Sequence, residues 1–144
     1  MAVRQLSIFL ENRKGRLEAI ARILADNNID IRGLAVADTA EFGILRLIVD
    51  DTDSAVKCLR AQDVVLHQND VTAVKVNRAP GGLLKLLSAL NDTQINVEYM
   101  YNLALPLGED PVLILRFSEP HAAREILRKA GCVLLDEKDL GVKG

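Results

Sequence analysis

The stretch that decides the fold is Gln5-Leu6-Ser7-Ile8-Phe9-Leu10-Glu11-Asn12-Arg13-Lys14-Gly15-Arg16-Leu17, because the chain contains a second version of it. The second version is Val71-Thr72-Ala73-Val74-Lys75-Val76-Asn77-Arg78-Ala79-Pro80-Gly81-Gly82-Leu83. Each begins with alternating apolar and polar residues and then reaches a polar turn with a glycine and a leucine. Such self-similarity indicates two copies of one structural unit.

The match continues beyond these stretches. At the same spacing Ile20 corresponds to Leu86, Leu24 to Leu90, Ile29 to Ile95 and Ile31 to Val97. Further along, Ile44-Leu45-Arg46-Leu47 corresponds to Val112-Leu113-Ile114-Leu115 after a two-residue insertion around Gly108. The shared order of apolar positions makes coincidence a poor explanation.

Each half is predicted to run strand, helix, strand, strand, helix, strand. In the first half, Leu17, Ile20, Ala21 and Leu24 have the spacing of one helical face, and Asn27-Asn28 ends this helix. Thr52 or Asp53 is expected to cap the second helix. The first-half strands are expected at 3–10, 30–37, 42–49 and 64–66. The second half repeats the order, with strands 71–77, 95–104, 111–118 and 132–136 and helices 82–91 and 120–130.

This order predicts an α+β fold of two tandem ferredoxin-like βαββαβ modules with antiparallel sheets. We expect the modules at residues 1–68 and 69–144, joined by a short polar linker at 68–70. Helices would cover one face of each sheet. The other faces need a partner, and two modules packed together can supply it for each other.

Composition excludes several classes of protein. The 144 residues carry 18 basic and 20 acidic side chains, a net charge of −2, which favours neither nucleic acid nor a membrane surface as partner. No signal peptide or membrane-spanning segment is recognisable, so we expect a cytoplasmic protein. Cys58 and Cys132 lie far apart without a CxxC motif, which favours two small buried side chains and predicts no metal and no cofactor.

The sequence also offers no catalytic constellation. His67 and His121 have no partners nearby in sequence, and the acidic runs 50–53 and 136–139 are interpreted as solvated caps and terminal charge. The basic turn around Arg13 leaves one alternative open, a small hydrolase of acyl phosphates. The favoured interpretation is a protein that is not an enzyme.

The turn at residues 11–17 is the most informative segment for binding. It leads into a helix N-terminus, where free N–H groups and the helix dipole favour a carboxylate. Asn12 adds a polar side chain, and Asp30 adds a fixed negative charge at the next strand. Together these groups suit the zwitterion of an α-amino acid. The alternative is purely structural, with Asn12 and Gly15 shaping the turn and Asp30 solvated.

These motifs resemble those of ACT domains. The segments that carry the resemblance are Asn12-x-x-Gly15-x-Leu17, Asn28-Ile29-Asp30-Ile31, Ala37-Asp38-Thr39 and 43–50, then Arg78-x-Pro80-Gly81-Gly82-Leu83 and Ile95 to Tyr101. The similarity covers roughly residues 3–67 and 70–137, which is the organisation of stand-alone tandem ACT proteins.

The resemblance implies a regulatory, allosteric module that binds an amino acid or a similar metabolite where modules meet. Such modules commonly form dimers, so a homodimer is expected. The family's loop Asn falls on Asn12, its Gly on Gly15 and its strand residue on Asp30. The second copy departs from this pattern, with Arg78 at the Asn position. The expected ligand-binding residues are Asn12, Arg13, Gly15, Arg16, Leu17, Asp30, Arg78, Gly81, Gly82 and Asn96.

One further alternative from another class remains open. The chain can be a regulatory or scaffold subunit that binds no metabolite and acts through a protein partner, such as an amino-acid biosynthetic enzyme. Tyr99-Met100-Tyr101 then becomes a candidate contact patch, although sheet core or a dimer seam explains these residues as well.

Overall fold

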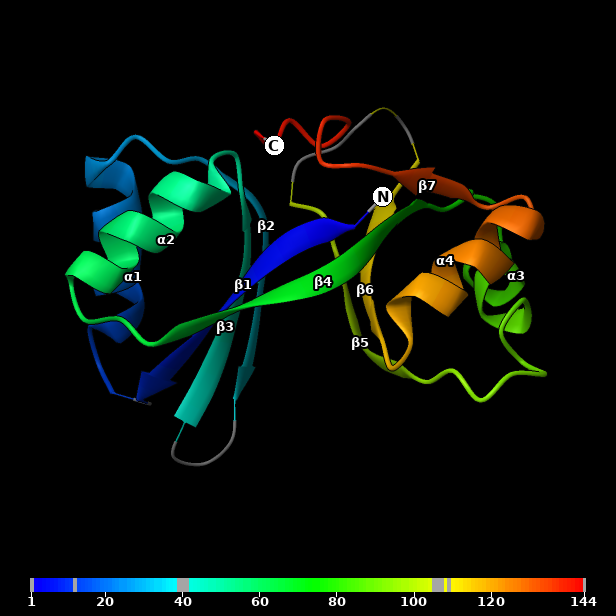
Figure 1. Ribbon diagram of the computed structural model, residues 1–144, viewed down its shortest axis with the longest axis horizontal. Helices are drawn as coiled ribbons and strands as arrows, with labels where there is room; N and C mark the ends of the chain where they lie inside the picture. Colours follow the sequence, from blue (N-terminus) through cyan, green and yellow to red (C-terminus); the bar gives the residue numbers. More distant parts are fainter. Residues whose placement is uncertain (1, 12, 39–41, 105–107, 109, 144) are drawn as a thin grey trace.

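The computed structural model describes all residues except 1, 12, 39–41, 105–107, 109 and 144. The described residues form seven strands and four helices in two halves (Figure 1). The first half holds β1 (Val3–Glu11), α1 (Arg16–Asp26), β2 (Ile31–Asp38), β3 (Phe42–Val49), α2 (Thr52–Ala61) and the start of β4 (Leu66–Lys75). The second half holds the rest of β4, then α3 (Gly82–Ser88), β5 (Val97–Asn102), β6 (Val112–Phe117), α4 (Pro120–Lys129) and β7 (Val133–Leu135).

The first sheet has the strand order β2-β3-β1-β4, and every neighbouring pair is antiparallel. Alternation along β1 sends Leu6, Ile8 and Leu10 toward the helices, where they join Ile20 and Leu24 of α1 in one buried cluster. The apolar stripe of α1 that the sequence predicted is therefore the stripe that packs on the sheet.

The second sheet repeats this arrangement. Its order is β7-β4-β6-β5, again antiparallel, and α3 and α4 cover its outer face. Leu86, Leu115, Phe117 and Leu127 form the centre of its core. The predicted α+β class and the doubled ferredoxin-like order are confirmed.

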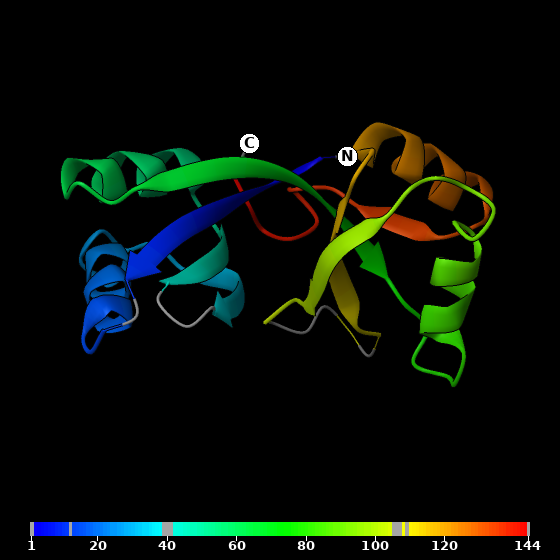
Figure 2. The same ribbon diagram turned by 90° about the horizontal axis from the view of Figure 1, so that it is seen from below.

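The two sheets share β4, which the sequence did not predict. Its residues 66–71 pair with β1, and residues 72–75 pair with β6. Figure 2 shows β4 running from one half of the molecule into the other. The residues expected to form a polar linker, 68–70, are therefore paired strand residues, and the strands expected at 64–66 and 71–77 are one continuous strand.

The helix-free faces of the two sheets pack against each other, as the sequence analysis expected. A third buried cluster fills the space between them, with side chains from both halves and from the C-terminal segment: Val3, Ile48, Val71, Ala73, Val112, Ile114, Leu140 and Val142. Both helical layers consequently lie on the outside of the molecule (Figure 1).

Local capping agrees with the sequence in part. Asn28 adopts a positive φ of 55° after α1, and Pro120 begins α4. The prediction that Thr52 or Asp53 caps α2 is wrong. The N-cap is Asp51, whose carboxylate accepts hydrogen bonds from the backbone N and the hydroxyl of Ser54. Thr52 is instead fully buried, and its hydroxyl has no partner among the described residues.

Candidate functional site

The first candidate loop joins β1 to α1. Gly15 is the N-cap of α1 with φ 89°, a left-handed conformation that favours glycine. Arg13 is exposed and pairs with Glu11 at 3.2 Å, while the buried Nε of Arg16 has no hydrogen-bond partner among the described residues. Leu17 is half exposed. Asn12, the residue expected to contact an ammonium group, lies outside the described residues.

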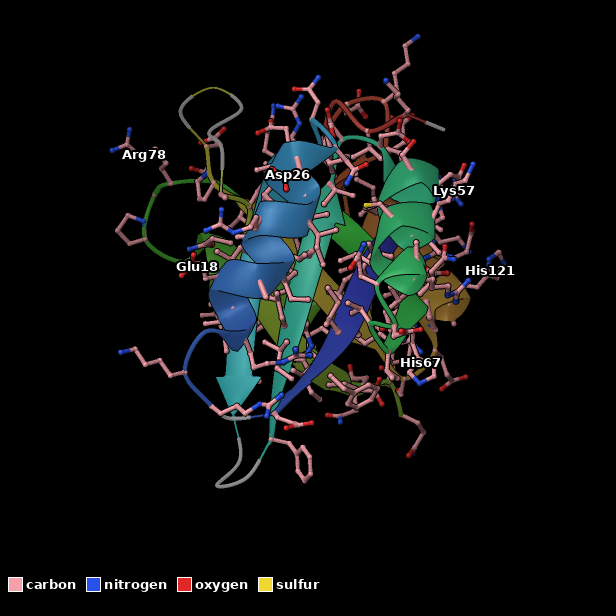
Figure 3. All side chains as sticks on the ribbon, turned by 90° about the vertical axis from the view of Figure 1, so that its left-hand side faces the viewer. Glu18, Asp26, Lys57, His67, Arg78 and His121 are labelled. Atoms are coloured by element: carbon pink, nitrogen blue, oxygen red, sulfur yellow. The ribbon has the colours of Figure 1, made fainter. Side chains whose placement is uncertain are left out.

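Asp30 lies away from this loop. The eleven residues of α1 separate the two, and a helix of that length spans about 16 Å. Figure 3 marks the two ends of α1 with Glu18 in the first turn and Asp26 in the last. Asp30 also pairs with Arg32 at 3.3 Å. Within one module, therefore, the loop and Asp30 cannot enclose a common ligand.

The second candidate loop joins β4 to α3 and is built in the same way. Gly81 is the N-cap of α3 with φ 94°, the counterpart of Gly15. Asn77 shapes the turn by accepting a hydrogen bond from the backbone N of Ala79 at 2.8 Å. A Cβ at Gly82 would lie 2.2 Å from the carbonyl oxygen of Asn77, so only glycine fits there.

A pocket of about 700 Å³ lies against this second loop. It is lined by Arg78, Gly81 and Gly82 on one side and by residues that follow β5 on the other. The side chain of Arg78 is exposed and makes no ion pair with any described residue. Asp110 lines the pocket as well, and its Oδ1 accepts a hydrogen bond from the backbone N of Arg78.

This pocket reaches the boundary between the modules. Ala104 lines it and donates a backbone hydrogen bond of 3.0 Å to the carbonyl oxygen of Arg32, near the start of β2. Leu103, also in the lining, forms a bridge with Gly33. Asn96, by contrast, lies directly before β5, where its backbone exchanges hydrogen bonds with Ser118. Of the second-module candidates, the pocket thus gathers Arg78, Gly81 and Gly82 but not Asn96.

A polar network between the sheets was missed by the sequence analysis. Gln5 is fully buried, accepts a hydrogen bond from the Tyr101 hydroxyl at 2.6 Å, and donates to the Tyr99 hydroxyl at 2.7 Å and to Ser7 at 3.0 Å. Ser7 in turn donates to Asn69 of β4. Burial raises the pKa of Tyr101 well above its usual range.

The signal for this network was present in the alternation of β1. Gln5 and Ser7 alternate with Leu6 and Ile8 and face away from the helices. In a half-buried strand, side chains on that face would be exposed. Only the packing of the second sheet onto this face buries them. Tyr99 and Tyr101, a candidate contact patch, thereby make contacts inside the chain between its two modules.

The two histidines lie on different halves of the molecule. His67 makes an edge-to-face contact with Phe9, with ring centroids 5.5 Å apart, and His121 is exposed on α4. In the part of the chain that the structure describes, no three His, Cys, Asp or Glu side chains are grouped so as to hold a metal. None of the described helices has the length and apolar character needed to cross a membrane.

The family model described as ACT domain pair matches residues 1–142. No curated protein matches the chain. The crystal structure of protein BT0572 from Bacteroides thetaiotaomicron is similar, with a TM-score of 0.91, 36% identity, and coverage of 98% of this chain and 96% of that one.

More distant structures share the fold alone. The ligand-free regulatory subunit of aspartate kinase from Thermus thermophilus has a TM-score of 0.60 at 14% identity, covering 88% of this chain and 91% of that one. The structure of aspartokinase alpha and beta subunits has a TM-score of 0.55 at 15% identity, covering 90% of this chain and 96% of that one.

Proposed function

The chain belongs to the family of ACT domain pairs, and from this membership we propose that it is a non-catalytic regulatory protein that binds an amino acid where its modules meet. The regulatory subunit of aspartate kinase has the same fold, which supports a regulatory role. The ligand sites proposed are the two β–α loops, with Asn12, Arg13, Gly15, Arg16 and Leu17 for the first module and Arg78, Gly81 and Gly82 for the second. Asp30 and Asn96 lie away from the loop of their own module, and we propose that they contact a ligand held by the loop of a neighbouring module.

The observation that carries this proposal is the pocket at the second loop. A volume of about 700 Å³ is within the range of small-molecule sites. Arg78 offers a guanidinium that no described carboxylate pairs with, which suits a ligand carboxylate, and Asp110 offers a carboxylate that suits an ammonium group. An α-amino acid carries both groups on adjacent atoms, so this pair of side chains is complementary to it.

The position of the pocket suggests how binding regulates. Its lining includes Leu103 and Ala104, which also bond to β2 of the other module. A ligand that binds one arrangement of this contact better than another shifts the population toward that arrangement. The amino acid would then alter the surface that the chain presents to a partner.

The test is thermal unfolding of the purified chain with each of the twenty amino acids, followed by calorimetric titration of the strongest stabiliser. A ligand specific to the folded state stabilises it by about 2.7 kcal/mol at a hundredfold excess over Kd, which is several degrees in midpoint. We expect amino acids of one chemical group to raise the unfolding midpoint and the others to leave it unchanged. Arg78→Ala should weaken binding at the second loop, and Asn12→Ala with Asp30→Ala should weaken it at the first.

Arg22→Ala is the matched control, because Arg22 is an exposed arginine of α1 that pairs with Glu18 and is not among the proposed ligand-binding residues. Affinity that is unchanged in both loop variants would refute the site assignment. If none of the twenty amino acids raises the midpoint of thermal unfolding, tight amino-acid binding itself is refuted. The alternative, a regulatory or scaffold subunit that acts only through a protein such as an amino-acid biosynthetic enzyme, would then be favoured.

A homodimer is part of the proposal, and α3 supports it. Leu83, Leu84 and Leu87 are 40%, 67% and 37% exposed on this short helix. Adjacent exposed leucines are typical of a surface that another protein covers. Sedimentation equilibrium of the chain with and without Leu84→Ser measures whether α3 holds two copies together.

A further inference from the structure

A second cleft lies between the two sheets. The inner faces of the sheets are apolar toward the C-terminal segment and polar at the opposite end. At the polar end a cleft of about 290 Å³ is open to solvent. Both modules line it: Ser7, Phe9, Ile44, Arg46, His67 and Asn69 from the first half and Glu98, Tyr99 and Arg116 from the second.

Arg46 of β3 is the unusual group in this cleft. Its guanidinium carbon lies 3.6 Å from the centroid of the Tyr99 ring, a cation–π contact between the modules. Its Nε is buried and has no hydrogen-bond partner in the part of the chain that the structure describes. Among the described residues Arg46 makes no ion pair either. A buried donor without a partner costs stability, so a ligand that accepts from it gains affinity.

The other arginine of the cleft is already neutralised. Arg116 pairs with Glu98 at 3.4 Å, and its NH1 donates to the carbonyl oxygen of Asp70 at 2.7 Å. The charges of Arg116 and Glu98 cancel. Arg46 therefore leaves the cleft one unbalanced positive charge, which matches a ligand with a single negative charge.

The wall opposite Arg46 is held in place by hydrogen bonds. Gln5 is fully buried and donates to the Tyr99 hydroxyl, so the hydroxyl's own proton is available to another acceptor. Phe9 and Ile44 add apolar surface beside these polar groups. The cleft thus combines a fixed cation, a fixed hydroxyl donor and a small apolar wall.

We propose that this cleft binds a small monocarboxylic acid, with the carboxylate on Arg46 and the apolar body against Phe9 and Ile44. Arginine is suited to this role because its planar fork binds both oxygens of a carboxylate. The site differs from the amino-acid pocket. Figure 3 shows His67, which lines the cleft, and Arg78, which lines the pocket, at opposite corners of the molecule.

Such a ligand would act on the packing of the modules. Arg46 and Ile44 belong to the first sheet, and Tyr99 belongs to the second. A carboxylate bound between them would link β3 to β5 at the open end of the space between the sheets. The buried apolar cluster between the sheets does not extend to this end. The carboxylic acid and the amino acid would then each affect how the two modules pack together.

The test is calorimetric titration with benzoate and isovalerate, using benzamide and isovaleramide as neutral isosteres. We expect both acids to bind and both amides to bind at least tenfold more weakly. Arg46→Gln should weaken the acids at least tenfold, whereas Arg22→Gln on the outer face of α1 should leave them unchanged. Inorganic phosphate is a separate arm, and phosphate binding tighter than both acids would overturn the assignment of a carboxylate ligand.

If Arg46→Gln does not fold, nuclear magnetic resonance of the unaltered protein provides a second test. The Arg46 side-chain Nε–H signal in a ¹⁵N-correlated spectrum should shift on addition of benzoate and not of benzamide. An unmoved signal, or equal affinity for acid and amide, would overturn the proposal. The variants of the proposed amino-acid sites, Arg78→Ala and Asp30→Ala, should retain acid binding, so failure of the amino-acid proposal and failure of this one are separable.

Discussion

At the scale of single residues, Gln5 shows how the contact between the modules gains specificity. Its side chain is fully buried, yet the carboxamide oxygen and nitrogen both have hydrogen-bond partners. A buried amide whose groups are satisfied adds modest stability, whereas one left without partners costs about 1–3 kcal/mol. Any other alignment of β5 against β1 would separate Tyr99 and Tyr101 from Gln5. The network therefore favours one register of the two sheets.

The raised pKa of Tyr101 makes this network testable by pH. The variant Tyr99→Phe leaves Tyr101 as the only tyrosine of the chain. Burial is the main cause of the shift and persists in this variant, so we expect tyrosinate absorbance to develop well above pH 10, the ordinary midpoint. Because the folded pKa exceeds the unfolded one, the stabilisation is complete below about pH 10 and is lost as pH rises further.

The same variant in concentrated guanidinium chloride is the control and should titrate near pH 10. A folded sample that titrates at this ordinary midpoint would contradict the burial of Tyr101 between the sheets.

At the scale of elements, the C-terminal segment does more than end the chain. After β7, residues 136–139 close a turn in which Asp136 and Asp139 each accept a hydrogen bond from the other's backbone N. The hydrogen bond from the backbone N of Asp139 stabilises the Asp136 carboxylate and lowers its pKa. The turn returns Leu140 to the space between the sheets, where it is 2% exposed. The acidic run interpreted as terminal charge is thus also the turn that places a core residue.

We expect Leu140→Ala to lower the free energy of unfolding by about 2–5 kcal/mol, as for other buried leucines. The measurement is urea denaturation followed by circular dichroism. Leu34→Ala in β2 is the matched control, because Leu34 is about half exposed and loses less buried surface. Equal losses in the two variants would show that the C-terminal segment does not pack between the sheets in solution.

The elements also show where sequence-based prediction succeeds. Period-2 and period-3.6 patterns located β1, α1 and their counterparts, since each buries one face against its own module. The run 66–75 was divided because Gln68-Asn69-Asp70 is polar, and polarity is typical of a turn. Those residues tolerate polarity as strand residues because Asn69 and Asp70 bond to Ser7, Arg116 and Arg124. These long-range partners are not visible in local sequence.

The candidate sites follow the same logic. The glycines of both loops were identified because the repeat placed them at equivalent turns, and both have positive φ. Arg46 was not singled out, because a lone arginine in a strand has no local signal. Its importance comes from Tyr99, which lies more than fifty residues further along the chain and on the other sheet.

At the scale of the whole molecule, the two modules are copies by sequence that share structural parts. They share β4, and the buried cluster between them draws side chains from both halves. We propose that residues 1–68 and 69–144 are two modules that fold as one unit. Val3 pairs with Val71, and Arg4 with Asp70, so a cut after residue 68 removes the partners of the start of β1.

We therefore expect the intact chain to unfold in a single calorimetric transition whose van't Hoff enthalpy equals the measured enthalpy. The fragment 1–68 should show no cooperative transition, because it exposes one whole face of its sheet and lacks part of its edge strand. A longer fragment, 1–75, restores the rest of β4 and serves as the comparison: it should gain strand content and still lack the inter-sheet cluster. Two separate transitions in the intact chain, or a fragment 1–68 that melts cooperatively, would mean that the shared strand joins two independently stable domains. In that case a ligand between the sheets would change the angle between two domains. If the chain is one cooperative unit, the ligand instead favours one packing of the two sheets over another.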